Sequence, residues 1–303
     1  MIDRRQLLAL GLAWLAACDG PRTMAARWLG AEVPDFEPPD AETVDPAHRL
    51  LCRAGFGPWP GDVEAVREIG IGAWIDRQLH PDAIDDTACT AMARRFDSLE
   101  ASPGDAREWE DATLREELQR YAVLRAVHSR RQVHESLVAF FSDHLNVSIH
   151  KPGVPALAPH YVREVIRPHA LGNFGDLLRA SARSPAMLVY LDGADNALRE
   201  PGDVPQENYA RELLELHALG VHGGYDQRDV MEAARALTGF VVRERLLRGR
   251  GSVAFESRWH DDGAKTVLGS LIAAGGGEGD LDALIDIVVH HPSTARHLAT
   301  RLV

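Results

Sequence analysis

Cysteine, lysine and positive charge are all scarce in this chain of 303 residues. Its three cysteines cannot build a disulfide framework, and since no Cys-x-x-Cys pair occurs, the commonest zinc sites are excluded. The 33 basic residues face 45 acidic ones, for a net charge of −12 that repels phosphate backbones. We therefore expect no nucleic-acid partner. Only two of the basic residues are lysines, which we attribute to a coding bias toward G and C.

Several well-known catalytic motifs are absent too. The sequence has no Gly-x-Ser-x-Gly elbow, no P-loop, no Gly-x-Gly-x-x-Gly and no His-Glu-x-x-His. Their absence removes the commonest serine-hydrolase, NTPase, dinucleotide-binding and zinc-protease interpretations. What the chain does have is material for a core, because 45% of its residues are apolar and 26% are charged, which excludes wholesale disorder.

The first residues carry the pattern of an export signal. The apolar run Leu7–Ala17 is about half of the roughly 20 residues that a membrane-spanning helix needs. Arg4 and Arg5 precede this run, and Cys18 follows its small residues. This order is typical of a twin-arginine signal with a lipobox, so we predict a signal peptide over residues 1–18 and lipidation of the cysteine. A general secretion signal with a chance cysteine is the alternative. We expect an exported, periplasmic protein, lipid-anchored to the inner or the outer membrane of the cell envelope.

The remainder divides into a tether and a helical domain. Residues 19–45 contain four prolines and many acids without a sustained period, which predicts a flexible tether. The apolar spacing of residues 46–303 is mostly helical, so the fold class is predicted to be mainly α, a multi-helix globular domain with a small β-hairpin near 240–259. A long helical region over 105–147 should break near 128–132, where apolar residues lapse. Other helices are expected at 48–54, 61–69, 72–79, 86–99, 155–170, 174–183, 205–219, 226–239, 280–290 and 292–303.

The densest polar constellation lies on the predicted helix 205–219. At about 100° per residue, one helix face collects Glu207, Asn208, Arg211, Glu212 and Glu215. Glu212 and Glu215 are three residues apart and can converge on a cation, so both are candidate ligands of a divalent metal ion. An ordinary surface ladder of ion pairs through Glu207, Arg211 and Glu215 is the alternative.

Histidines and acids elsewhere complete the candidate set. His217 projects from the apolar face of the same helix, either as a buried residue bonded to a carbonyl or as a site residue acting apart from the carboxylates. His144 ends an apolar helix face and Asp192 lies in an acidic loop, and we add both to the candidate metal ligands. A fourth cluster follows the hairpin and contains His260, Asp261 and Lys265. Each cluster alone is more often a turn or a helix cap than a functional site.

Taken together, several segments resemble a known family, and they occur in the family's order along almost the whole chain from about residue 46. The segments are His48-Arg-Leu-Leu-Cys-Arg-Ala-Gly-Phe-Gly57, Phe141-Ser-Asp-His-Leu145, Ser184-Pro-Ala-Met-Leu-Val-Tyr-Leu-Asp192, Gln206-Glu-Asn-Tyr-Ala-Arg-Glu-Leu-Leu-Glu-Leu-His217, Asp229-Val-Met-Glu-Ala-Ala-Arg-Ala-Leu-Thr-Gly239 and His260-Asp-Asp-Gly-Ala-Lys265. They resemble the bacterial domain-of-unknown-function 1800 family. The resemblance implies a largely helical exported protein, often encoded beside a partner of the domain-of-unknown-function 1501 family, and no established reaction.

The resemblance has two limits. Gln206 stands where we expect an asparagine, and Phe141 and Asp143 replace the tryptophan and asparagine expected around His144. If those positions build a site, this copy of it is altered. Family members also usually continue past the helix with which this sequence ends, so we expect that a C-terminal portion is missing.

Two functions of different classes remain open. The first is an interaction or assembly role at the envelope, in which acidic helix faces dock a partner such as the neighbouring gene product. The alternative is a metal-dependent hydrolase, in which Asp192, Glu212, Glu215 and a histidine hold a divalent cation while Arg211 or Lys265 binds an anionic group of the substrate. The second function requires the scattered clusters to meet in one pocket.

Overall fold

The computed structural model describes residues 44–243 and 249–303, and the chain divides into a unit of residues 1–45 and a unit of residues 46–303. Every helix and strand described below belongs to the second unit. The predicted signal peptide, the predicted lipidation site Cys18 and nearly all of the predicted tether lie outside the described residues. No helix among the described residues has the length and hydropathy needed to cross a membrane.

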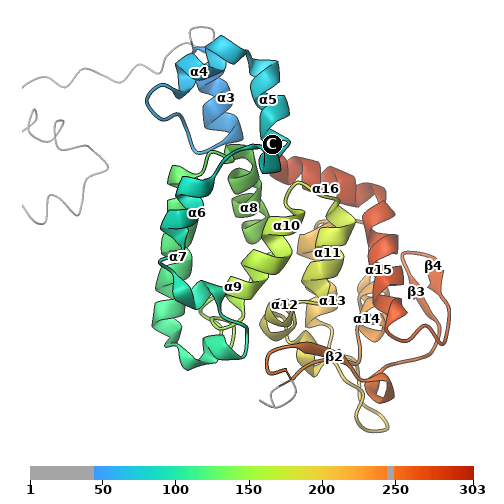
Figure 1. The fold of residues 1–303 in the computed structure, drawn as a ribbon. Coiled ribbons are helices and arrows are strands. Elements are labelled where there is room, and N and C mark those ends of the chain that lie inside the picture. Colours follow the sequence, from blue (N-terminus) through green and yellow to red (C-terminus); the bar gives the residue numbers. More distant parts are fainter. Residues whose placement is uncertain (1–43, 244–248) are drawn as a thin grey trace, which may run out of the picture. The chain divides into compact units, whose positions relative to one another are not determined.

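The unit is built mainly from helices (Figure 1). Its α-helices are α3 (Pro46–Ala54), α4 (Asp62–Ile69), α5 (Ile71–Gln78), α6 (Thr87–Ala93), α7 (Asp111–His128), α8 (Gln132–His144), α9 (Ala158–Tyr161), α10 (Arg167–His169), α11 (Phe174–Ala182), α12 (Pro185–Tyr190), α13 (Asn208–Glu212), α14 (Gln227–Ala236), α15 (Gly279–His290) and α16 (Pro292–Leu302). Two π-helices are η4 (Val162–Ile166) and η6 (Leu213–Ala218). Short 3-10 turns are η1 (Pro81–Ala83), η2 (Asp97–Glu100), η3 (Asp105–Glu108), η5 (Gly193–Asp195) and η8 (Ser257–Trp259).

Two small antiparallel hairpins accompany the helices. Strand β1 (Phe240–Val242) pairs with β2 (Val253–Phe255), and β3 (Lys265–Val267) pairs with β4 (Ser270–Ile272). The predicted mainly α fold with a hairpin near 240–259 is therefore confirmed, although part of the turn of that hairpin lies outside the described residues. The break predicted near 128–132 is also confirmed, since α7 ends at His128 and α8 begins at Gln132.

Local capping residues place several of these helices. Asn173 accepts hydrogen bonds from the backbone N–H groups of Gly175 and Asp176 at the start of α11. Asp226 and Asp229 form a reciprocal capping box at the start of α14. Each cap satisfies backbone donors that the first turn of a helix leaves without partners. The starts of α11 and α14 are thus encoded in the local sequence.

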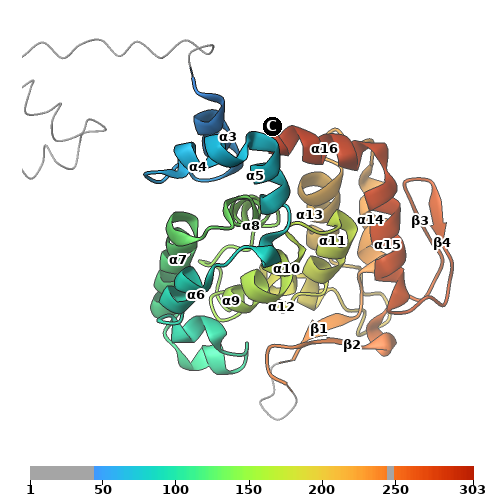
Figure 2. The same cartoon turned by 45° about the horizontal axis from the view of Figure 1, so that its top comes forward.

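One large core lies under α8 to α15. Fully buried side chains from distant segments meet there, among them Leu177 of α11, Met187 of α12, Leu214 of η6 and Leu284 of α15. Burying such a side chain stabilises the fold by about 1.5–3 kcal/mol. A separate, smaller core centred on Trp74 joins α3, α4 and α5. Helices α7 and α8 lie at the end of the unit opposite the β3–β4 hairpin in both views (Figure 2).

Candidate functional site

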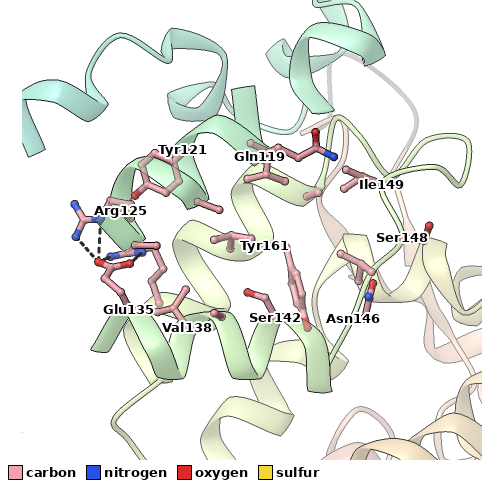
Figure 3. A pocket seen from close by; sticks show the side chains of 18 of the residues that line it. Gln119, Tyr121, Arg125, Glu135, Val138, Ser142, Asn146, Ser148, Ile149 and Tyr161 are labelled. Carbon is pink, nitrogen blue, oxygen red and sulfur yellow. Dashed lines mark hydrogen bonds and ion pairs between the residues drawn. The ribbon is translucent and has the colours of Figure 1, made fainter. Parts of the chain in front are cut away.

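A cavity of about 390 Å³ opens between α7, α8 and the helix formed by α9 and η4. Helix α7 lines it with Leu118 and Ala122, and helix α8 lines it with Val138 and Ala139. The ring of Tyr161 lies between the two ends of the cavity (Figure 3). The lining is mainly apolar, and its volume falls within the range of about 300–1,000 Å³ that is typical of small-molecule sites.

A buried group of charged side chains closes one end of the cavity (Figure 3). Arg125 donates to Oε1 of Glu135 at 2.9 Å from Nε and 2.6 Å from Nη2. Arg167 donates to the two oxygens of the same carboxylate at 2.8 and 2.7 Å. Behind this group, Asp86 pairs with Arg125 at 3.0 Å and accepts hydrogen bonds from Ser129 and the Arg130 backbone.

The charges of this group balance within the protein. Burial alone would raise the pKa of Glu135, but the hydrogen bonds from Arg167 and the charges of Arg167 and Arg125 hold its pKa far below the ordinary value. Burial opposes the charged form of Arg125, yet the charge of Glu135 holds its pKa above the ordinary value. Two guanidinium groups thus face two carboxylates, so a ligand entering the cavity meets no uncompensated charge from this group.

The hydroxyl of Tyr161 is also engaged by the protein. It donates to the Leu145 carbonyl at 2.9 Å and lies 2.8 Å from the Ser181 hydroxyl. Burial raises the pKa of Tyr161, so the phenol stays neutral. Only the apolar body of its ring is left to the cavity, where Asn146, Ser148 and Ile149 form the opposite end (Figure 3).

Gln132 joins the start of α8 to the end of α7 and to the turn after α3. Its side-chain amide donates to the carbonyls of Ala126 and Ser129 at 3.1 and 2.7 Å, which satisfies the end of α7. The same side chain accepts a hydrogen bond of 3.0 Å from the Phe56 backbone. Gly55 is required for this approach, because a Cβ atom there would lie 2.9 Å from Oε1 of Gln132. The turn at Gly55 and Phe56 therefore contacts the start of α8, one of the helices that line the cavity.

The predicted polar helix face is only partly assembled as a site. Glu207 pairs with Arg211 at 2.7 Å and accepts 2.6 Å from Gln227, which is the surface ion pair foreseen as the alternative. Both hydrogen bonds lower the pKa of Glu207. Burial and the charge of Glu215 raise the pKa of Glu212. The regular helix expected over 205–219 is interrupted, because α13 passes into the π-helix η6 at Leu213.

Asp192 lies next to Asn208, as part of a different group. Its carboxylate accepts 2.5 Å from Lys151 and 3.3 Å from Asn208, and the lysine also donates to the Tyr190 carbonyl at 2.8 Å. Asp192 has a φ of 59°, a left-handed conformation in which aspartate is enriched among non-glycine residues. The sequence did not single out Lys151, although it is one of only two lysines in the chain.

His144 and His217 are brought together, through the backbone. The Nε2–H of His144 donates to the His217 carbonyl at 2.9 Å, and His297 of α16 donates in the same way to the Leu216 carbonyl at 3.0 Å. The rings of His144 and His297 lie 5.7 Å apart. Burial and the neighbouring His144 lower the pKa of His217 to about 3. Its Nδ1 is buried and has no partner in the described part of the chain.

The cluster after the hairpin is assembled, and it is internally satisfied. Asp261 forms a two-pronged ion pair with Arg235 at 2.7 and 2.9 Å. Lys265 is 1% exposed and donates to Asp280 at 2.5 Å as well as to two backbone carbonyls. His260 lies 3.1 Å from the same Asp280 carboxylate. These contacts join the loop to α14 and α15, which is a structural role.

The candidate metal ligands do not gather into one group. Across residues 44–243 and 249–303, no three His, Cys, Asp or Glu side chains are placed so that they could hold a metal ion. His144 donates to a carbonyl, and Asp192 is held by Lys151. A divalent cation at Glu212 and Glu215 therefore stays a prediction for metal analysis to test.

Neither the cavity nor the charged group at its closed end was predicted from the sequence. One signal was present: the buried positions of α8 recur every three residues as Glu135, Val138, Phe141 and His144. An acid in line with buried apolar residues almost always has a cationic partner. That argument could have identified Glu135, but the partners Arg125 and Arg167 come from other helices and leave no pattern of their own.

One family model matches most of the chain. The model of a family described as "protein of unknown function (DUF1800)" matches residues 49–303. No curated protein matches the chain. No solved structure matches it either. Since the family match covers all but the first part of the sequence and agrees with the resemblance of its motifs, the chain belongs to the DUF1800 family.

Proposed function

We propose that the chain is an exported, lipid-tethered binding protein of the cell envelope, and that the cavity between α7 and α8 is its binding site. The ligand class is an unbranched hydrocarbon chain, such as the acyl chain of a lipid. The observation that most directly supports this proposal is the mainly apolar cavity of about 390 Å³, in which the charges of Arg125, Arg167 and Glu135 compensate one another. The proposal gives the interaction role a site, and a protein partner from the neighbouring gene stays a separate prediction.

The chemistry of the walls supports a hydrocarbon over a polar ligand. A polar ligand loses its hydration on entry and needs donors or acceptors to replace it. The strongest donors at the closed end, Arg125 and Arg167, already serve Glu135, and the Tyr161 hydroxyl serves the core. A hydrocarbon needs no such replacement and gains about 0.8 kcal/mol for each CH₂ group that it buries.

Filling the cavity tests the proposal. Ala122 of α7 and Ala139 of α8 line the cavity and are exposed, so a tryptophan at either position can occupy it without displacing the core. Ala112 is exposed near the start of α7 and is not among the lining residues, which makes Ala112→Trp the matched control. The probe is a fluorescent long-chain fatty acid, titrated into the full chain.

We expect saturable binding that Ala122→Trp and Ala139→Trp each weaken by about tenfold or more, equivalent to ~1.4 kcal/mol. Ala112→Trp should leave the affinity unchanged. Circular dichroism of each variant serves as the check on folding. Absence of saturable binding, or equal affinity in well-folded filled variants, would refute the hydrocarbon site.

One observation favours the metal-dependent hydrolase as a second candidate. Because burial and the charge of Glu215 raise the pKa of Glu212, a divalent cation bound between the two would relieve that repulsion. Metal analysis of chelator-free protein tests it. Stoichiometric metal that is lost in Glu212→Gln and Glu215→Gln, but retained in Glu207→Gln, supports this candidate. Metal-free protein removes it.

A further inference from the structure

An apolar row lies exposed on the small helical core formed by α3, α4 and α5. Ile71 and Ile75 of α5 and Leu79, the residue that caps its C-terminus, follow one another at intervals of four residues and are 40%, 38% and 50% exposed. Ile69, at the end of α4, is 45% exposed. The helix buries different residues, Trp74 and Gln78. The apolar row is thus additional to the face with which α5 packs.

The charge of this region differs from that of the whole chain. Within residues 46–79, four arginines balance four acids, whereas the chain carries a net charge of −12. The arginines are Arg49, Arg53, Arg67 and Arg77, and the acids are Asp62, Glu64, Glu68 and Asp76. An anionic surface would therefore repel this region less than it repels the rest of the protein.

The position of the row along the chain connects it with the predicted anchor. Only residues 19–43 separate Cys18 from the first described residues, and α3 begins at Pro46. The composition of residues 19–43 predicts a flexible tether, and a chain of that kind and length spans about 5–6 Å times the square root of its residue number, which is roughly 30 Å. A tether of that reach keeps the α3–α5 region at a high effective concentration beside the membrane that holds it.

From these observations we infer that the row Ile69, Ile71, Ile75 and Leu79 is a lipid-docking surface, and that it inserts into the boundary between headgroups and acyl chains of the bilayer to which the tether is anchored. Apolar residues on one side of a surface helix bind membranes in this way, in proportion to the area that they bury. The inference rests on the lipid tether of the proposed function. It adds a second contact, which turns a loosely tethered protein into one held against the bilayer in a fixed orientation.

The test is photolabelling from within the membrane. The full chain, produced in a bacterial host that exports and acylates lipoproteins, is reconstituted into vesicles of phosphatidylethanolamine and phosphatidylglycerol that contain a diazirine-bearing phospholipid. Labelled peptides are then identified by mass spectrometry. The peptide of residues 69–79 should be labelled, together with the acylated peptide that begins at Cys18. The peptide that contains β4, whose Leu271 is 71% exposed and does not line the proposed binding cavity, is the internal reference for background labelling.

Variants separate docking from chance contact. Ile71→Asp with Ile75→Asp should reduce labelling of residues 69–79 to that of the β4 peptide, and Leu271→Asp should leave the labelling of residues 69–79 unchanged. Labelling of the anchor without labelling of residues 69–79 would overturn the docking surface and leave the tether standing. Labelling of neither would overturn both. Labelling of residues 69–79 that persists in the aspartate variant would also refute lipid docking. So would a wild-type oligomer that dissociates in the aspartate variant, because the row would then bind a second copy of the chain.

Discussion

Replacing Glu135 with glutamine is the sharpest test of how the closed end of the cavity is built. The wild-type carboxylate has a side chain that is 3% exposed and accepts hydrogen bonds from Arg125 and Arg167 at 2.6–2.9 Å. Glutamine keeps the shape but removes the negative charge, which leaves Asp86 as the sole carboxylate for two guanidinium groups. Breaking one partner of a buried ion pair costs about 3–5 kcal/mol, so we expect a loss of that size in the free energy of unfolding.

The loss in the free energy of unfolding should depend on pH, in a direction set by the pKa of Glu135. Its pKa in the folded protein lies below the ordinary value of 4.5, so the folded state favours the ionised form. The stabilisation is therefore complete above about pH 4.5 and is lost as the pH falls toward the folded pKa. Urea denaturation of wild type and Glu135→Gln should show a constant gap from pH 7 to 5 and a shrinking gap below it.

An exposed ion pair supplies the control. Arg120 and Glu116 lie 2.6 Å apart on α7 with side chains 65% and 60% exposed, and such pairs contribute only about 0.3–0.5 kcal/mol. Glu116→Gln should therefore change stability little. If Glu135→Gln costs no more than Glu116→Gln, or if its effect grows on acidification, the account of the buried group is wrong.

Three further predictions concern other parts of the fold. Between pH 6.5 and the lowered pKa of about 3 for His217, the unfolded chain binds a proton at this imidazole that the folded chain does not bind. The free energy of unfolding should therefore fall by about 1.4 kcal/mol for each pH unit of acidification, and His217→Leu, denatured at pH 7 and at pH 5, should lack that part of the slope. Lys265→Met leaves the buried Asp280 without its cation and should cost about 3–5 kcal/mol by thermal unfolding, whereas an unchanged midpoint would deny the lysine its structural role. Gly55→Ala brings a Cβ atom against Gln132 and should cost about 1–3 kcal/mol in urea, a result that a wild-type midpoint would contradict.

The sequence predicted the helices where the pattern is local. The lapse of apolar residues after His128 marks the end of α7, and the β1–β2 hairpin follows branched and aromatic residues on both sides of a glycine-rich turn. The β3–β4 hairpin was missed because its turn holds Leu268 and Gly269 at φ values of 52° and 76°. Such turns usually contain Asn-Gly or Asp-Gly, so a leucine at this position does not indicate one.

The candidate site was harder to predict than the fold. His260, Asp261 and Lys265 were grouped from the sequence because they are neighbours in the chain, and in the structure they contact Arg235 and Asp280. The cavity arises from an imperfect fit between the faces of α7, α8 and η4, and an empty volume leaves no residue pattern. The change from α13 to the π-helix η6 could not be predicted either. Its hydrogen bonds join residues five apart instead of four, and this change depends on packing rather than on local preference.

Two imidazoles join α8 and α16 to the same end of η6. His144 of α8 and His297 of α16 each donate through Nε2, to the neighbouring carbonyls of His217 and Leu216. The two rings lie 5.7 Å apart, so the two helices meet η6 side by side. Since both bond to consecutive peptide groups, a displacement of η6 along its axis would carry α8 and α16 with it.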